Sequence, residues 1–81
     1  MRTTEFVKAY FISLGFEEKE FEIKESQDSL GYLISVVLKK DNPRIGIIIG
    51  KRGRNLRILK QLIRVIGFNE RITPFLVLRL E

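Results

Sequence analysis

The residues best suited to chemistry in this sequence lie at positions 50–53, where two glycines enclose two cations. Lys51 and Arg52 stand between Gly50 and Gly53. Glycine lets a backbone turn tightly and approach a ligand without side-chain obstruction. A helix is expected directly after Gly53, and the first amides of a helix point unpaired at whatever lies beyond them. Cations at the tip of such a turn suit the phosphates of a nucleic-acid backbone.

Positive charge is concentrated in the second half of the chain. Residues 1–40 hold six Lys/Arg and seven Asp/Glu, a net of −1, whereas residues 41–81 hold nine and three, a net of +6, which together give +5. Six basic residues and no acid occur within 51–64: Lys51, Arg52, Arg54, Arg57, Lys60 and Arg64. This concentration indicates a surface for a polyanion, although a solvated helix face would have the same composition.

An apolar segment precedes the glycine turn. Ile47, Ile48 and Ile49 are more apolar residues than one short helix can bury on one face. We therefore expect one or two of them, with part of the strand at 30–39, to line a groove in which bases lie flat, and Gly46 to leave that groove open. The alternative is that all three isoleucines belong to the core.

Six elements are needed to position this segment, in the order helix, strand, strand, helix, helix, strand. Apolar residues at helical spacing, strand alternation and turn residues place them at 4–14, 20–25, 30–39, 44–49, 54–66 and 71–80. The two adjacent strands are expected to form an antiparallel hairpin, and Pro74 favours an edge position for the last strand. The elements predict a two-layer α+β domain with helices on one sheet face.

The helix ends carry specific signals. Thr3 or Thr4 is expected to cap the first helix, and Asn42 the helix that starts near Pro43. Gly15 is expected to end the first helix, with Phe16 folding back on Phe11. The pair Gly67-Phe68 repeats that ending after the 54–66 helix. On that helix, a basic face carries Arg54, Arg57, Lys60 and Arg64, and the opposite side, expected to dock on the sheet, carries Leu56, Leu59, Leu62, Ile63 and Ile66.

Composition argues against catalysis. The chain has no cysteine and no histidine, which excludes disulfides, thiol-ligated zinc and the common nucleophile–base sets. The run from Gly46 to Lys51 is one residue short of a Walker A loop, and Arg52 replaces its Ser/Thr. Alternation along the 20–25 strand spreads its glutamates over a solvated face. We expect no catalytic residue, no metal, no cofactor, no small-molecule substrate and no membrane segment, and a cytoplasmic protein.

The segment from Ile48 to Leu56 resembles the signature of KH domains: an apolar pair, G-x-x-G, and an apolar residue three positions further on. The element order α-β-β-α-α-β resembles the type II, prokaryotic arrangement over essentially the whole chain, so 1–81 is expected to be a single KH domain. The stretch is similar to small bacterial single-KH RNA-binding proteins (KhpA class), to the KH domain of Jag-type proteins and to the KH modules of NusA-type transcription factors. The resemblance implies a mixed three-stranded sheet with three helices on one face.

The same resemblance implies a non-catalytic protein that holds about four nucleotides of single-stranded RNA beside the G-x-x-G loop, with single-stranded DNA as an alternative ligand. The RNA-binding residues expected are Gly46, Ile47, Ile49, Gly50, Lys51, Arg52, Gly53, Arg54, Asn55, Arg57 and Arg64. The alternative is a protein-interaction module, because four apolar residues could leave a patch on the uncovered sheet face for a homo- or heterodimer: Leu33, Val37, Phe75 and Val77.

Overall fold

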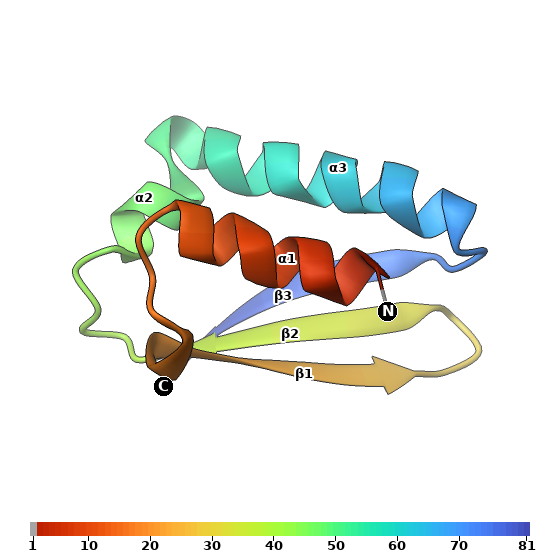
Figure 1. Cartoon of the computed structure of the whole chain (residues 1–81), viewed down its shortest axis with the longest axis horizontal. Coiled ribbons are helices and arrows are strands. Elements are labelled where there is room, and N and C mark those ends of the chain that lie inside the picture. The colour runs from red at the N-terminus through yellow and green to blue at the C-terminus, as the bar shows by residue number, and fades with distance from the viewer. Residues whose placement is uncertain (1) are drawn as a thin grey trace.

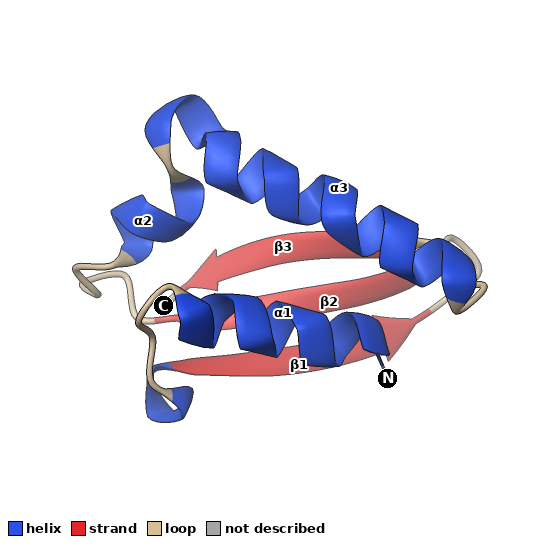
Figure 2. Ribbon diagram, turned by 45° about the horizontal axis from the view of Figure 1, so that its top comes forward, coloured by secondary structure: helices blue, strands red, loops and turns tan. Residues whose placement is uncertain are grey.

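A three-stranded sheet forms one layer of the molecule, and the helices cover one of its faces (Figures 1 and 2). The computed structural model describes residues 2–81. Its elements are α1 (Arg2–Ser13), the 3-10 turn η1 (Glu18–Glu20), β1 (Phe21–Gln27), β2 (Tyr32–Leu38), α2 (Ile45–Ile49), the 3-10 turn η2 (Lys51–Gly53), α3 (Arg54–Asn69) and β3 (Pro74–Leu80). The predicted α+β class and element order are confirmed.

The sheet is mixed, with strand order β1-β2-β3. β1 pairs antiparallel with β2, Phe21 opposite Leu38, and β3 pairs parallel with β2, Pro74 opposite Tyr32. The predicted hairpin and the edge position of Pro74 are therefore confirmed. β2 is paired along both sides, so within residues 2–81 the edges of the sheet belong to β1 and β3.

The first helix ends as predicted but begins differently. Gly15 has φ +100, its N–H donates to the Ile12 carbonyl, and the Phe16 N–H donates to the Phe11 carbonyl at 3.2 Å, which is the Schellman pattern. At the other end, α1 already includes Thr3, whose side chain is buried. Thr4 also lies inside the helix, so neither of the two predicted residues is the cap. A residue 67 positions away from Thr3, Glu70, accepts the hydrogen bonds of Thr3 instead.

The predicted ending of α3 at Gly67 is wrong, since the helix continues to Asn69. Gly67 keeps a helical conformation and packs against β3: a Cβ built on it would lie 2.7 Å from the Pro74 ring. The glycine is required by this close contact rather than by a left-handed turn. The Gly67 carbonyl then accepts the N–H of Ile72, which turns the chain into β3.

The core lies between the sheet and the two long helices. α1 contributes Val7 and Phe11, and α3 contributes Leu59 and Ile63, to a buried cluster completed by Phe16, Tyr32, Ile34, Val36, Leu38, Ile48 and Leu76. The predicted docking side of α3 is confirmed for Leu59 and Ile63, with Leu56 and Ile66 partly buried. Leu62 is 40% exposed and so lies on the flank of the helix, not against the sheet.

The length and polarity of the helices decide whether any of them could cross a membrane. Within residues 2–81, no helix combines the length and the apolar character that crossing a bilayer requires.

Candidate nucleic-acid interface

The chain enters the glycine loop through a turn held by Asn42. The Asn42 Oδ1 accepts the N–H of Arg44 at 2.8 Å, and the Asn42 carbonyl accepts the N–H of Ile45. Helix α2 starts at Ile45, one residue later than predicted, because Arg44 has φ −90 and ψ 0 and lies outside the helix. Asn42 therefore shapes the turn before α2 rather than capping its first residue.

The loop between α2 and α3 depends on its two glycines. Gly50 has φ 74 and ψ 177, a conformation that only glycine adopts readily, and Gly53 has φ 74 and ψ 16. Arg52 is also left-handed, with φ 56 and ψ 29, which is unusual for a residue with a side chain. The consecutive left-handed residues Arg52 and Gly53 form the tip of the loop.

The side chain of Asn55 braces this loop through a hydrogen bond to α2. Its Nδ2 donates to the carbonyl of Ile47 at 2.8 Å, which joins the start of α3 to α2 across the turn. Gly50 lies against it so closely that a Cβ built there would meet the Asn55 Cγ at 2.7 Å. The side chain that the sequence assigned to RNA contact thus has a positioning contact within the protein.

Four cations gather at this end of α3. The side chains of Lys51, Arg52, Arg54 and Arg57 line a hollow of about 440 Å³. No acidic residue occurs anywhere between positions 42 and 69, so the hollow has no nearby partner in sequence that would neutralise it. Like charges held together in this way attract a polyanion and release its counterions on binding.

The protein itself orients one of these cations. The Arg57 Nη2 donates to the carbonyl of Arg52 at 3.3 Å, which fastens the guanidinium to the loop. A guanidinium has five N–H donors, so this contact leaves others for a ligand. Gly53, at the N-cap of α3, supplies no side-chain cap, and the positive end of the helix dipole adds to the charge of the hollow.

The isoleucines next to the loop have three different environments. Ile48 is fully buried in the core, Ile49 is partly buried against it, and Ile47 is 45% exposed. Gly46 is exposed, and a Cβ built on it would meet nothing within 4 Å. Ile47 and Gly46 therefore present an accessible apolar surface beside the four cations. Ile49 instead packs partly against the core.

Arg64 is not part of this group. It lies ten residues after Arg54 on α3, about 15 Å further along the helix axis. There it borders a separate hollow with Val65, Phe68 and Asn69. The structure thus brings together the loop residues and the first turn of α3, but not the last residue of the predicted basic track.

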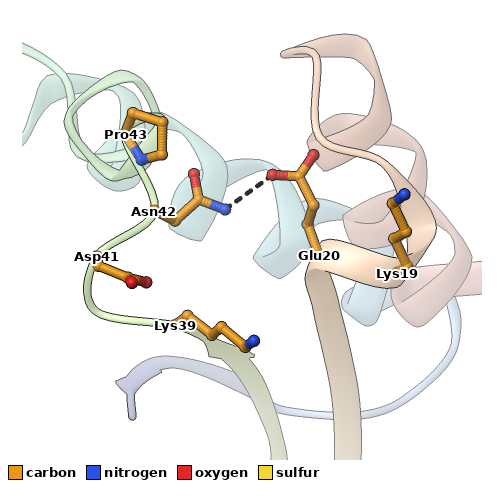
Figure 3. A pocket seen from close by; sticks show the side chains of 6 residues that line it. All are labelled: Lys19, Glu20, Lys39, Asp41, Asn42 and Pro43. Carbon is orange, nitrogen blue, oxygen red and sulfur yellow. Dashed lines mark hydrogen bonds between the residues drawn. The ribbon is translucent and has the colours of Figure 1, made fainter.

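A third hollow, of about 430 Å³, lies where η1 meets the segment before α2 (Figure 3). The Asn42 Nδ2 donates to the Glu20 carboxylate across it at 2.9 Å. Glu20 also accepts the Glu17 N–H and lies 3.7 Å from the Arg44 guanidinium. The Glu17 amide and then the Asn42 amide lower the pKa of Glu20. Because its lining includes two carboxylates and two lysines, this hollow is poorly suited to an anion and serves to anchor the chain entering α2.

This anchor was not predicted from the sequence. Glu20 lies in an acidic run that strand alternation assigned to a solvated face, whereas it belongs to η1 and is partly buried. A weak signal existed: Glu20 stands three residues after Glu17, the spacing of a capping box, and the two form one. The acidic residues show no metal site either, since no group of three potential ligands gathers within residues 2–81.

The fold belongs to a known class, an α+β arrangement with a three-stranded mixed sheet that matches the KH-like region of a larger protein of known structure. That protein is Era from Aquifex aeolicus, in a crystal structure bound to GDP and AlF4−, and its C-terminal domain is a type II KH domain. The TM-score is 0.59 at 20% sequence identity, and the alignment covers 96% of this chain but 29% of the Era chain. The predicted type II KH fold is therefore confirmed.

The comparisons with sequences give no finer assignment. No protein-family model matches the chain, and no curated protein matches it. At 20% identity the similarity to Era concerns the fold alone. The closer resemblance to small single-KH proteins, and the extent of the domain over 1–81, stay predictions.

Proposed function

We propose that the chain binds single-stranded RNA, without catalysis, at the glycine loop and the adjoining ends of α2 and α3. The observation that carries the proposal is the hollow lined by Lys51, Arg52, Arg54 and Arg57 on a loop whose glycines open the backbone. The cations would bind phosphates, and the Arg57 contact to the Arg52 carbonyl would hold that side chain ready before RNA arrives.

An apolar surface beside the cations favours a single strand over a duplex. Ile47 and Gly46 offer an exposed, uncharged surface on α2 where unstacked bases could lie, with Ile49 at its margin. A duplex keeps its bases stacked inside and would present only phosphates to this site. Asn55 acts in this proposal by bracing the loop, and Arg64 contributes only to a strand that runs further along α3. Single-stranded DNA shares the phosphates and bases and would bind through the same contacts.

The test is charge reversal at the tip of the loop. Lys51 and Arg52 are exposed, so replacing both by Asp should leave the thermal melt close to that of the parent while single-stranded RNA affinity, measured by fluorescence anisotropy, falls by more than about tenfold. A matched control is Lys19→Asp with Lys39→Asp, which removes two exposed lysines at the hollow of Figure 3 and alters the net charge equally.

The result that would contradict the proposal is equal loss in both double variants, since that would indicate a response to net charge alone. Unchanged affinity after reversal of Lys51 and Arg52 would also contradict it. Competition with a matched duplex at the same salt concentration tests strandedness: the duplex should compete less well than the single strand.

A further inference from the structure

The face of the sheet that the helices leave uncovered has a regular pattern of side chains. Strand pairing places one residue from each strand in each of three rows across this face. From one end to the other, the rows are Glu22–Val37–Arg79, Lys24–Ser35–Val77 and Ser26–Leu33–Phe75. Phe75 and Val77 are 46% and 43% exposed. The face is therefore apolar along β2 and β3, with charged residues toward its two edges.

We propose that this face packs against the same face of a second copy of the chain, forming a weak two-fold dimer. A two-fold axis parallel to β2 places β1 of one copy over β3 of the other, row by row. Two aligned sheets pack about 10 Å apart with strands within ~30° of each other, so residues of one row meet their counterparts approximately.

The residues that this axis brings together are complementary in the first and third rows, and in the second row the aliphatic stem of Lys24 lies over Val77. In the first row, Glu22 of each copy meets Arg79 of the other, which gives two ion pairs. In the third row, the small Ser26 faces the large Phe75. Along the axis, the β2 residues of this face meet the same residues of the second copy. Among them, the nearly buried Ser35 lies between two apolar residues, Leu33 and Val37. An isologous interface requires this self-complementarity.

Charge favours a second copy on the sheet face rather than on the helical face. Helix α3 also exposes apolar side chains, among them Val65 and Phe68. Its sixteen residues include four cations and no acid, so two copies approaching through α3 would repel each other. The sheet face carries both signs, and its one acidic residue, Glu22, meets Arg79 of the other copy. An acidic partner protein would gain most on α3 and has no electrostatic reason to choose the sheet.

The size of the face predicts a weak dimer. Three strands at the usual spacing and seven residues in length offer a footprint of about 300 Å² on each copy. A stable interface usually buries ~800 Å² on each partner. Self-association should therefore appear only at high protein concentration. The dimer would leave the glycine loops free, because the helical layer lies on the opposite side of each sheet (Figure 2).

A charge-swap experiment tests this geometry by sedimentation velocity over a wide range of protein concentration. Glu22 and Arg79 are both exposed, so Glu22→Arg and Arg79→Glu should fold as the parent does. In either variant alone, the ion pairs become like-charge contacts, and the dimer dissociation constant should rise by about tenfold or more. In a 1:1 mixture of the two variants, both pairs are restored in the heterodimer, and association should return to near the parent value.

Nonspecific attraction does not explain such a rescue. Starting from +5, Glu22→Arg gives +7 and Arg79→Glu gives +3, so both variants remain positive. If Glu22 and Arg79 acted only within their own chain, mixing the two variants would not restore association. Failure of the mixture to associate better than the separate variants would overturn the proposal, and so would a parent protein that stays monomeric at every concentration.

A second pair of variants distinguishes the two exposed apolar surfaces. Val77→Asp on the sheet should abolish self-association, whereas Val65→Asp on α3 should leave it unchanged, with thermal melts recorded for both. Loss of association in Val65→Asp alone would assign the dimer to the helical face and overturn the proposal. If Val77→Asp fails to fold, the charge-swap mixture still decides the question.

Discussion

Glu70 caps the first turn of α1 through Thr3, a residue 67 positions earlier in the chain. Its Oε1 accepts the backbone N–H of Thr3 at 2.5 Å and the Thr3 hydroxyl at 2.7 Å. The contact pairs a first-turn donor of α1 that has no partner within the helix, and it places a negative charge at the positive end of the helix dipole. It also fastens the end of α3 to the start of α1, so the two long helices are joined at the end of the molecule remote from the glycine loop.

This contact predicts a loss of stability in acid. The Thr3 hydroxyl is the main cause that lowers the pKa of Glu70 below its ordinary value near 4.5. A carboxyl whose pKa is lower in the folded state stabilises the protein fully above its unfolded pKa, and this contribution is lost as the pH falls through the folded pKa. Urea unfolding at a series of pH values from neutral into acid should therefore show Glu70→Gln to be less stable than the parent at neutral pH, with a shallower decline in stability below about pH 5.

A double-mutant cycle separates this contact from general charge effects. Thr3→Val removes the hydroxyl while keeping a similar shape in a buried position. The two substitutions should be less than additive in the free energy of unfolding, because Thr3→Val removes the hydroxyl hydrogen bond and Glu70→Gln weakens the same bond by removing the charge of its acceptor. Additive effects would contradict the assigned contact. Some acid dependence should persist in every variant, since Glu18 and Glu20 also have lowered pKa values.

Two glycines in helices should respond oppositely to alanine. Gly67→Ala places a methyl group 2.7 Å from the Pro74 ring, so the gain in helix propensity should be outweighed and the protein should lose about 1–2 kcal/mol of stability. Gly46→Ala meets no atom within 4 Å and should be neutral or stabilising by up to ~1 kcal/mol. Denaturant unfolding of both variants checks this, and a tolerated Gly67→Ala would contradict the close packing of α3 on β3.

The pair Gly-Phe, which occurs at 15–16 and at 67–68, shows how much of the fold local sequence patterns can predict. Gly15-Phe16 ends the first helix as the sequence predicts, because the whole motif lies within six residues of chain. Gly67-Phe68 is the same pair of residues, but here the glycine is required because Pro74 of β3 packs closely against it. Likewise Thr3 is a residue type that often caps helices, yet its hydroxyl donates a hydrogen bond to the distant Glu70. Local patterns predicted the elements and their order, and the errors fall where a distant contact decides.

The glycines of the loop should differ in what they tolerate. Gly50→Ala combines a strained backbone conformation with a methyl group 2.7 Å from the Asn55 Cγ, and should cost more than about 2 kcal/mol. Gly53 is left-handed with open space around it. Since Asn tolerates that conformation, Gly53→Asn should cost less than about 1 kcal/mol. Thermal or urea unfolding measures both. Equal costs would mean that the brace at Asn55 does not constrain the loop.

The candidate site was predictable where it depends on the chain itself. The glycine spacing, the cations between the glycines and the helix that follows are local, and the structure joins Lys51, Arg52, Arg54 and Arg57 around one hollow. The internal contact of Asn55 with Ile47 and the anchoring of Asn42 by Glu20 were not predictable. They depend on how the chain returns on itself, and polar residues in a loop give no sign of whether they face a ligand or the protein.

The salt dependence of RNA binding tests the central proposal most directly. If Lys51, Arg52, Arg54 and Arg57 neutralise three to four phosphates of a single strand, the logarithm of the affinity should fall with the logarithm of salt concentration at a slope of roughly −2 to −3. Arg57→Ala should reduce the steepness by about 0.7. Polar replacement of the exposed Ile47 should weaken binding with the slope unchanged. A flat salt response in the parent protein would contradict the account, because the four cations would then not contact a phosphate backbone.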